Sequence, residues 1–113
     1  MSRVERVQGR LGELDALLLN DLTNIRWLTG FTGSNGWAIV ASDGLTLVTD
    51  GRYGVQAAQQ MAAAGVDGEV LVGATGAATL QHIADTCNRY QRVGFEAAHV
   101  TFAQHRQYTQ LIS

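Results

Sequence analysis

The sequence has no lysine, no proline and only one cysteine among its 113 residues. A P-loop needs a lysine after its second glycine, so the absence of lysine excludes that phosphate-binding motif. The single cysteine, Cys87, cannot form a disulfide within the chain and is expected to pack in the core. Without proline, repeats or low-complexity tracts there is no sign of a linker, so the chain is expected to fold as one domain.

Charged residues are also scarce. They make up 16% of the chain against 46% hydrophobic residues, and the net charge is −2, a balance typical of a folded α/β domain. The eight basic residues are all arginines scattered along the sequence, so neither nucleic acid nor a membrane surface is expected as a partner. No stretch has the pattern of a signal peptide or a membrane span, and we expect a cytoplasmic location.

Hydrophobic periodicity predicts alternating helices and strands. Apolar residues at helical spacing predict helices over residues 3–11, 52–64, 77–88 and 101–111, the last opened by a capping box of Thr101 and Gln104. Short apolar runs predict strands over residues 16–19, 69–72 and 92–95. Asp21 or Thr23 is expected to cap one further helical turn.

A hairpin is predicted at the centre of the sheet, because residues 37–41 and 45–49 are apolar and flank an Asp-Gly pair. With Asp43 and Gly44 as its loop, Trp37 lies beside Asp50. Alternation then places Trp37, Ile39, Ala41 and Val48 on one face and Ala38, Val40, Leu45 and Leu47 on the other. Since both faces are apolar, helices are expected to cover both sides of a mixed sheet.

Asp50 follows the hairpin and is expected to be the N-cap of the helix over residues 52–64. The packing face of this helix is expected to consist of Ala57, Ala58, Met61 and Ala62, and Gly65 is expected to end it. Arg52 would lie in the first turn, where the helix dipole disfavours a cation. We therefore expect a carboxylate partner close to Arg52.

The stretch from Asn24 to Gly36 is the most distinctive part of the chain. Its first half contains Ile25, Trp27 and Leu28, which are expected to pack against the core. Its second half interleaves Gly30, Gly33 and Gly36 with Thr32, Ser34 and Asn35. Glycine at this density indicates positive φ or a close approach of the backbone to something. A strand rather than a helix is predicted after Gly36, which argues against a dinucleotide-binding loop.

Two large rings, Phe31 and Trp37, bracket this glycine loop. A loop on a rigid scaffold is a natural contact surface, so both rings are expected to be exposed there as part of an interface.

Two motifs resemble the amino-terminal domain of the creatinase/prolidase family of metallopeptidases. The first is Asn-Ile-Arg-Trp-Leu-Thr-Gly-Phe-Thr-Gly-Ser-Asn over residues 24–35, in which Trp27 replaces the more usual tyrosine. The second is Thr-Asp-Gly-Arg-Tyr over residues 49–53, and weaker similarity follows at residues 93–96 and 99–101. This family includes Xaa-Pro aminopeptidases and Xaa-Pro dipeptidases, and the resemblance covers essentially the whole chain.

The resemblance implies a creatinase N-terminal-like, ribonuclease H-like fold for residues 1–113. It further implies a non-catalytic N-terminal domain of a Xaa-Pro peptidase, whose two divalent metal ions, of the Mn, Co or Zn type, belong to a carboxy-terminal catalytic domain of pita-bread fold. No counterpart of that domain is in this sequence, and no metal or cofactor is expected in this chain. His82, His99 and His105 lie on separate predicted elements without metal-ligand spacing.

In this family the domain commonly assembles homodimers or higher homo-oligomers and shapes the pocket for a proline-containing peptide. The candidate pocket or interface residues are Phe31, Ser34, Asn35, Trp37, Arg26 and Arg52. The residues expected to be structural are Asp50, Gly30, Gly33 and Gly36. No catalytic or metal-binding residue is assigned.

Several alternatives remain open. Arg26 and Arg52 could instead be structural partners of Asp21 and Asp50, and the glycine loop could be a packed turn. The chain could belong to a relative of the creatine amidinohydrolases, although these carry an arginine in the loop where residues 34–36 stand. It could also be a peptidase-like protein-binding module.

Overall fold

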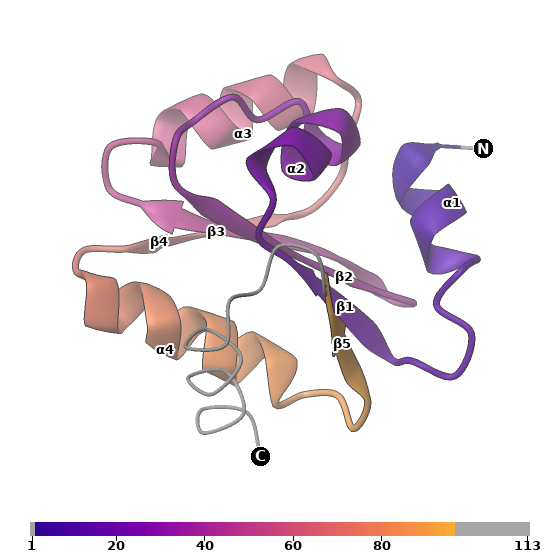
Figure 1. Cartoon of the computed structure of the whole chain (residues 1–113). Helices are drawn as coiled ribbons and strands as arrows, with labels where there is room; N and C mark the ends of the chain where they lie inside the picture. Colours follow the sequence, from indigo (N-terminus) through magenta and orange to yellow (C-terminus); the bar gives the residue numbers. More distant parts are fainter. Residues whose placement is uncertain (1, 97–113) are drawn as a thin grey trace.

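The computed structural model describes residues 2–96 as a five-stranded mixed sheet with helices on both faces (Figure 1). The helices are α1 Arg3–Gln8, α2 Leu22–Thr29, α3 Gly54–Ala63 and α4 Gly76–Cys87. The strands are β1 Ala16–Leu19, β2 Gly36–Ala41, β3 Gly44–Asp50, β4 Glu69–Gly73 and β5 Val93–Phe95. The predicted fold class is confirmed. The helix predicted over residues 101–111 lies outside the described residues.

The predicted hairpin is at the centre of the sheet, whose strand order is β4-β3-β2-β1-β5. Strand β2 pairs antiparallel with β1 and β3, whereas β3 with β4 and β1 with β5 are parallel. Four strands therefore end at the same edge of the sheet, and β2 begins there. In open α/β sheets this edge is where ligands usually bind.

The two faces of the sheet hold separate hydrophobic cores. On one face, α1, α2 and α3 pack over Ala38, Val40, Leu45 and Leu47. On the other face, α4 packs over Ala16, Leu18, Ile39, Ala41 and Val48 through Ile83 and Cys87. The predicted division of the hairpin side chains between two covered faces is confirmed.

The predicted hairpin register is wrong by two residues. Ala41 pairs with Gly44, so the loop is Ser42-Asp43, and Trp37 lies opposite Val48 instead of Asp50. A shift of one residue would exchange the two faces, whereas a shift of two preserves them. The apolar pattern therefore specifies which side chains lie on each face but not the position of the loop. In the loop, Asp43 accepts a 2.7 Å hydrogen bond from the distant Tyr90 hydroxyl.

The single helical turn predicted after Asp21 is instead the eight-residue helix α2, which takes up the first half of the Asn24–Gly36 stretch. Asp21 is its N-cap and accepts a hydrogen bond from the amide of Thr23. Ile25 and Leu28 are buried as predicted, but Trp27 is 44% exposed, because it lies on the opposite face of α2. The prediction that Trp27 packs in the core is therefore wrong.

Helix α3 is shorter than predicted and begins at Gly54. Ala57 and Met61 form its packing face, whereas Ala58 and Ala62 are exposed and do not belong to it. Gly65 has a positive φ of 70° just after the C-cap Ala64, which confirms its role in ending the helix. Helix α1 also ends early, at Gln8 rather than at residue 11.

Candidate functional site at the end of the hairpin

The site lies where β3 ends and β2 begins, and it is built around the carboxylate of Asp50. One carboxylate oxygen accepts hydrogen bonds from the backbone amide of Arg52 at 2.9 Å and from its Nε at 3.2 Å. The other accepts from Asn35 Nδ2 at 2.9 Å and from an Arg52 terminal nitrogen at 2.8 Å. The predicted role of Asp50 as N-cap of α3 is wrong: the N-cap position is Tyr53, and Asp50 closes the turn before it.

The carboxylate partner predicted for Arg52 is Asp50 itself. Hydrogen bonds from Arg52 and Asn35 hold the pKa of the Asp50 carboxyl well below its usual range. The same contact raises the pKa of Arg52. The Arg52 side chain remains 69% exposed and its guanidinium stacks 4.9 Å from the centre of the Tyr53 ring. Arg52 is thus a fixed cation at the surface, which still has donors directed to solvent.

The glycine loop is attached to this group by side chains on both sides. The Thr49 hydroxyl donates to the backbone oxygen of Asn35 at 2.6 Å, and the hydroxyls of Ser34 and Tyr53 lie 2.6 Å apart. The hydrogen bonds with Ser34 lower the pKa of Tyr53. Thr32 is bonded to Gln60 of α3 through both its amide and its hydroxyl. These contacts fix the position of Asn35 relative to Asp50.

The glycines are explained by the ring of Phe31, which is only 1% exposed. A Cβ atom at Gly33 would overlap this ring, and one at Gly36 would lie 3.0 Å from it. Gly30 has a φ of 83° and is the left-handed C-cap of α2. The structure thus gives a packing or backbone reason for each of these glycines. The prediction that Phe31 is exposed is wrong, because the loop is wrapped around its ring.

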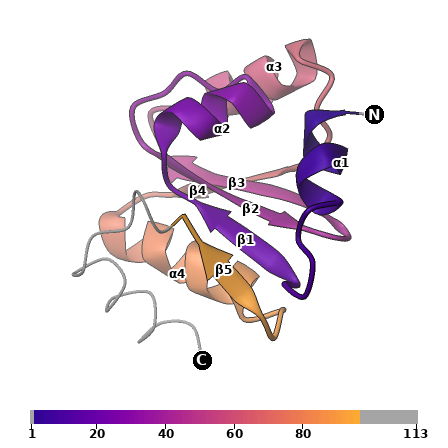
Figure 2. The same ribbon diagram turned by 45° about the vertical axis from the view of Figure 1, so that its right-hand side comes forward.

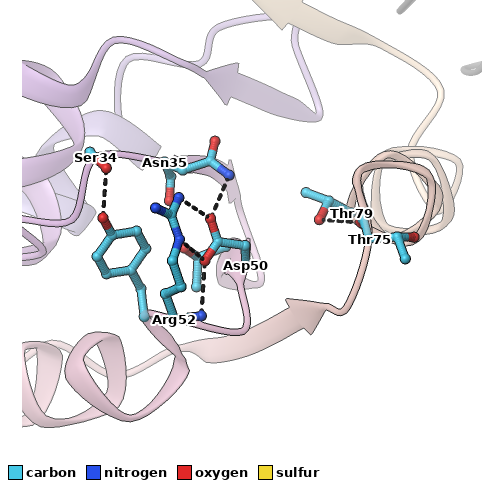
Figure 3. Close-up of polar contacts among 8 residues, drawn as sticks. Ser34, Asn35, Asp50, Arg52, Thr75 and Thr79 are labelled. Atoms are coloured by element: carbon cyan, nitrogen blue, oxygen red, sulfur yellow. Dashed lines mark hydrogen bonds and ion pairs between the residues drawn. The ribbon is translucent and has the colours of Figure 1, made fainter.

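Beyond Asp50 the surface is hollowed into an open pocket of about 650 Å³. Its walls are Asn35, Trp37 and residues 50–52 on one side and residues 73–76, Thr79 and Leu80 of the β4–α4 connection and α4 on the other. Figure 3 shows Thr75 and Thr79 across this space from Asn35, Asp50 and Arg52. Trp37 is half-buried and packs its ring against the core beneath α4. The structure therefore brings together Asn35, Trp37 and Arg52, and places Ser34 at their margin.

The predicted residues do not all lie at this pocket. Arg26 is exposed on the outer face of α2 and does not line the pocket. Sequence reasoning missed Tyr53, which anchors Ser34, and it missed Thr75, which accepts a hydrogen bond from Ala78 as N-cap of α4. The threonine before the apolar pattern of that helix was the available signal.

The side chains around the pocket are suited to binding a polar ligand. They supply an amide, a guanidinium and hydroxyl groups beside an apolar wall. All four acceptor positions of the Asp50 carboxylate are already used by Asn35 and Arg52. Within residues 2–96, no group of three or more His, Cys, Asp and Glu side chains is placed to hold a metal ion.

Cys87 is buried, as predicted, and burial raises the pKa of its thiol to about 11. His82 lies against the backbone oxygen of Val72.

Comparison with known proteins identifies the family. The profile of the Creatinase/Prolidase N-terminal domain matches residues 3–113. A Bacillus subtilis protein described as "Uncharacterized peptidase YqhT" is 34% identical over the whole of this chain, which covers 31% of that protein. The crystal structure of the N-terminal domain of cytoplasmic peptidase PepQ from Mycobacterium tuberculosis is 33% identical, with a TM-score of 0.83 over 96% of this chain and 83% of that one.

A Xaa-Pro dipeptidase from Bacillus anthracis shares the fold, with a TM-score of 0.88 at 24% identity, over 98% of this chain and 31% of that one. By the family profile over residues 3–113, the chain belongs to the creatinase/prolidase N-terminal domain family. It spans about a third of the length of the first relatives that it matches. Among the helices described, none is long and apolar enough to cross a membrane.

Proposed function

We propose that this chain is the non-catalytic N-terminal domain of a cytoplasmic Xaa-Pro peptidase, and that the end of its hairpin forms part of the wall of the substrate pocket. The observation that carries this proposal is the fixed group of Asn35, Asp50 and Arg52 beside Trp37, in an open pocket at the edge of the sheet. Since Asp50 is saturated with hydrogen bonds, the groups available to a peptide are the amide of Asn35, the guanidinium of Arg52 and the ring of Trp37.

The metal ions in this proposal belong to the catalytic domain that follows in relatives of about three times this length. The chemistry of hydrolysis would lie there, on two divalent ions of the Mn, Co or Zn type. The N-terminal domain would contribute binding and assembly, in contact with that domain and with a second copy of the protein. Its substrate would be a peptide with proline in the second position.

The test uses the full-length protein with Mn²⁺ and Xaa-Pro dipeptides and tripeptides. Asn35→Ala and Trp37→Leu are expected to raise KM by about three- to tenfold or to shift the oligomer toward monomer, because they remove ground-state contacts while the metal site is intact. Asn88→Ala is the matched control: Asn88 is exposed at the far end of α4, away from the pocket. The 113-residue chain alone is expected to show no turnover.

Unchanged KM and unchanged sedimentation in both variants would contradict the pocket role. Turnover by the isolated chain that follows the protein through further purification would contradict the non-catalytic role.

A further inference from the structure

A second surface, which lies away from the hairpin end, gathers three of the eight arginines of the chain. Helix α1 exposes Arg3 and Arg6, one turn apart, and the turn after it exposes Arg10. Arg6 and Arg10 line the same hollow as Trp27 of α2. Figure 2 shows α1 beside α2 over the sheet. The fold thus produces a positively charged surface, although the net charge of the whole chain is −2.

Most of these cations have no partner among residues 2–96. In the described part, the guanidinium groups of Arg6 and Arg10 make no hydrogen bond or ion pair. Glu5 lies among them and lines the same hollow, and its capping box with Ser2 favours the ionised carboxylate, so it offsets part of their charge. Arg3, Arg6 and Arg10 outnumber it, so within residues 2–96 this face keeps a net positive charge.

The ring at the centre of this surface is held in place. Arg3 donates a hydrogen bond of 2.7 Å to the backbone oxygen of Trp27 and its guanidinium lies 5.1 Å from the centre of the ring. Trp27 is nevertheless 44% exposed, and together with Val7, Arg6 and Arg10 it lines a hollow of about 570 Å³. Tryptophan and arginine are the residue types that contribute most to protein interfaces, and an ordered ring loses little entropy on binding.

We propose that this surface, the α1–α2 face of Arg3, Arg6, Arg10 and Trp27, binds an acidic segment of a partner polypeptide. Carboxylates of the segment would pair with Arg6 and Arg10, and an apolar side chain between them would enter the hollow against Trp27 and Val7. Charge complementarity and the concave shape favour a peptide. A bilayer would instead be contacted by protruding apolar side chains, and this face offers one ring at the rim of a hollow.

The experiment measures binding of a blocked eight-residue peptide of alternating glutamate and leucine by isothermal titration calorimetry at low salt. We expect a Kd below about 1 mM that weakens as salt is added. The double substitution Arg6→Gln with Arg10→Gln is expected to weaken binding about tenfold, as two exposed ion pairs are lost. Arg10→Gln alone is expected to weaken binding about threefold. Arg89→Gln, which removes the same single charge at the end of α4, is its control and is expected to change the Kd less than twofold. Urea melts verify that each variant is folded.

Absence of binding to the wild-type chain would overturn the proposal. So would equal binding of the peptide in which glutamine replaces glutamate, or an equal loss in the Arg89 control, because either result would mean that the arginines of this face are not what recognises the peptide. Binding to phosphatidylserine vesicles that depends on Arg6 and Arg10, without binding to the peptide, would also overturn it in favour of a membrane. Since none of these residues lines the hairpin-end pocket, the outcome is independent of the proposed pocket role.

Discussion

The two sides of the glycine loop have opposite properties, although they are separated by only a few residues. On the inner side, Phe31 is buried and Gly33 and Gly36 leave room for its ring. On the outer side, Asn35 reaches across to Asp50, and the Asp50–Arg52 pair opens to a pocket. The comparison shows that the apolar half of this loop serves packing, so that its polar half is the part available for recognition.

The largest expected effect is on the inner side. Phe31→Ala removes a ring that is 1% exposed and is expected to lower the free energy of unfolding by about 3 to 5 kcal/mol, as truncation of core aromatic residues does. Gly33→Ala is expected to destabilise the chain as well, because the new Cβ would overlap the ring of Phe31. Urea denaturation followed by circular dichroism measures both effects.

Gly51→Ala is the matched control for Gly33→Ala, since a Cβ at Gly51 meets nothing within 4 Å. If Phe31→Ala changed the free energy of unfolding by less than about 1 kcal/mol, the ring would not be part of the core and the contrast between the two sides would be lost.

An intermediate effect is expected on the outer side, at Asp50. Its lowered pKa means that the folded state favours the ionised carboxylate, so Asp50 stabilises the fold above the unfolded pKa of about 4, and this contribution is lost as the pH falls below that value. Because the hydrogen bonds with Arg52 are the main cause, Asp50→Asn is expected to be about as damaging as Asp50→Ala at pH 7.

Urea midpoints for the parent and both variants at pH 7, 4 and 2.5 measure this contribution. The gap between parent and variants is expected to narrow from pH 4 to pH 2.5. An asparagine variant as stable as the parent at pH 7 would mean that capping geometry, and not the charge pair with Arg52, is what Asp50 supplies.

The sequence was sufficient for the order of elements and for the faces of the hairpin, because alternation of apolar residues specifies which side of a strand is buried. It was not sufficient for the position of the hairpin loop, since a shift of two residues leaves that alternation unchanged. Glycine density indicated a close approach at Gly33 and Gly36, but what approaches is Phe31 of the same loop. Trp27 was assigned to the core because local hydrophobicity does not say which side of a short helix faces the sheet.

The grouping of Asn35, Asp50 and Arg52 was partly predictable, because the hairpin had to bring both motifs to one edge. The sequence predicted a carboxylate close to Arg52 and left Asp50 as one alternative, on the premise that Arg52 lies in the first helical turn; helix α3 begins only at Gly54. The far wall of the pocket, with Thr75 and Thr79, depends on how β4 and α4 pass the end of β3, and no local pattern encodes that tertiary arrangement.

The smallest expected effect is at the rim, where Ser34 and Tyr53 meet. Their hydroxyls are 2.6 Å apart, and the hydrogen bonds with Ser34 lower the pKa of Tyr53. Ser34→Ala is expected to raise the pKa of Tyr53 toward its ordinary value of about 10 while changing the stability little, because both groups lie at the surface.

Tyrosinate absorbance followed from pH 8 to pH 13 measures the change, and Tyr53→Phe identifies which step of the titration belongs to Tyr53. Tyr90 serves as an internal reference, since burial, with the hydrogen bond to Asp43, raises its pKa to about 12. If the step removed by Tyr53→Phe has the same midpoint with and without Ser34, the two hydroxyls are not bonded in solution, and the outer side of the loop is less firmly held than the inner side.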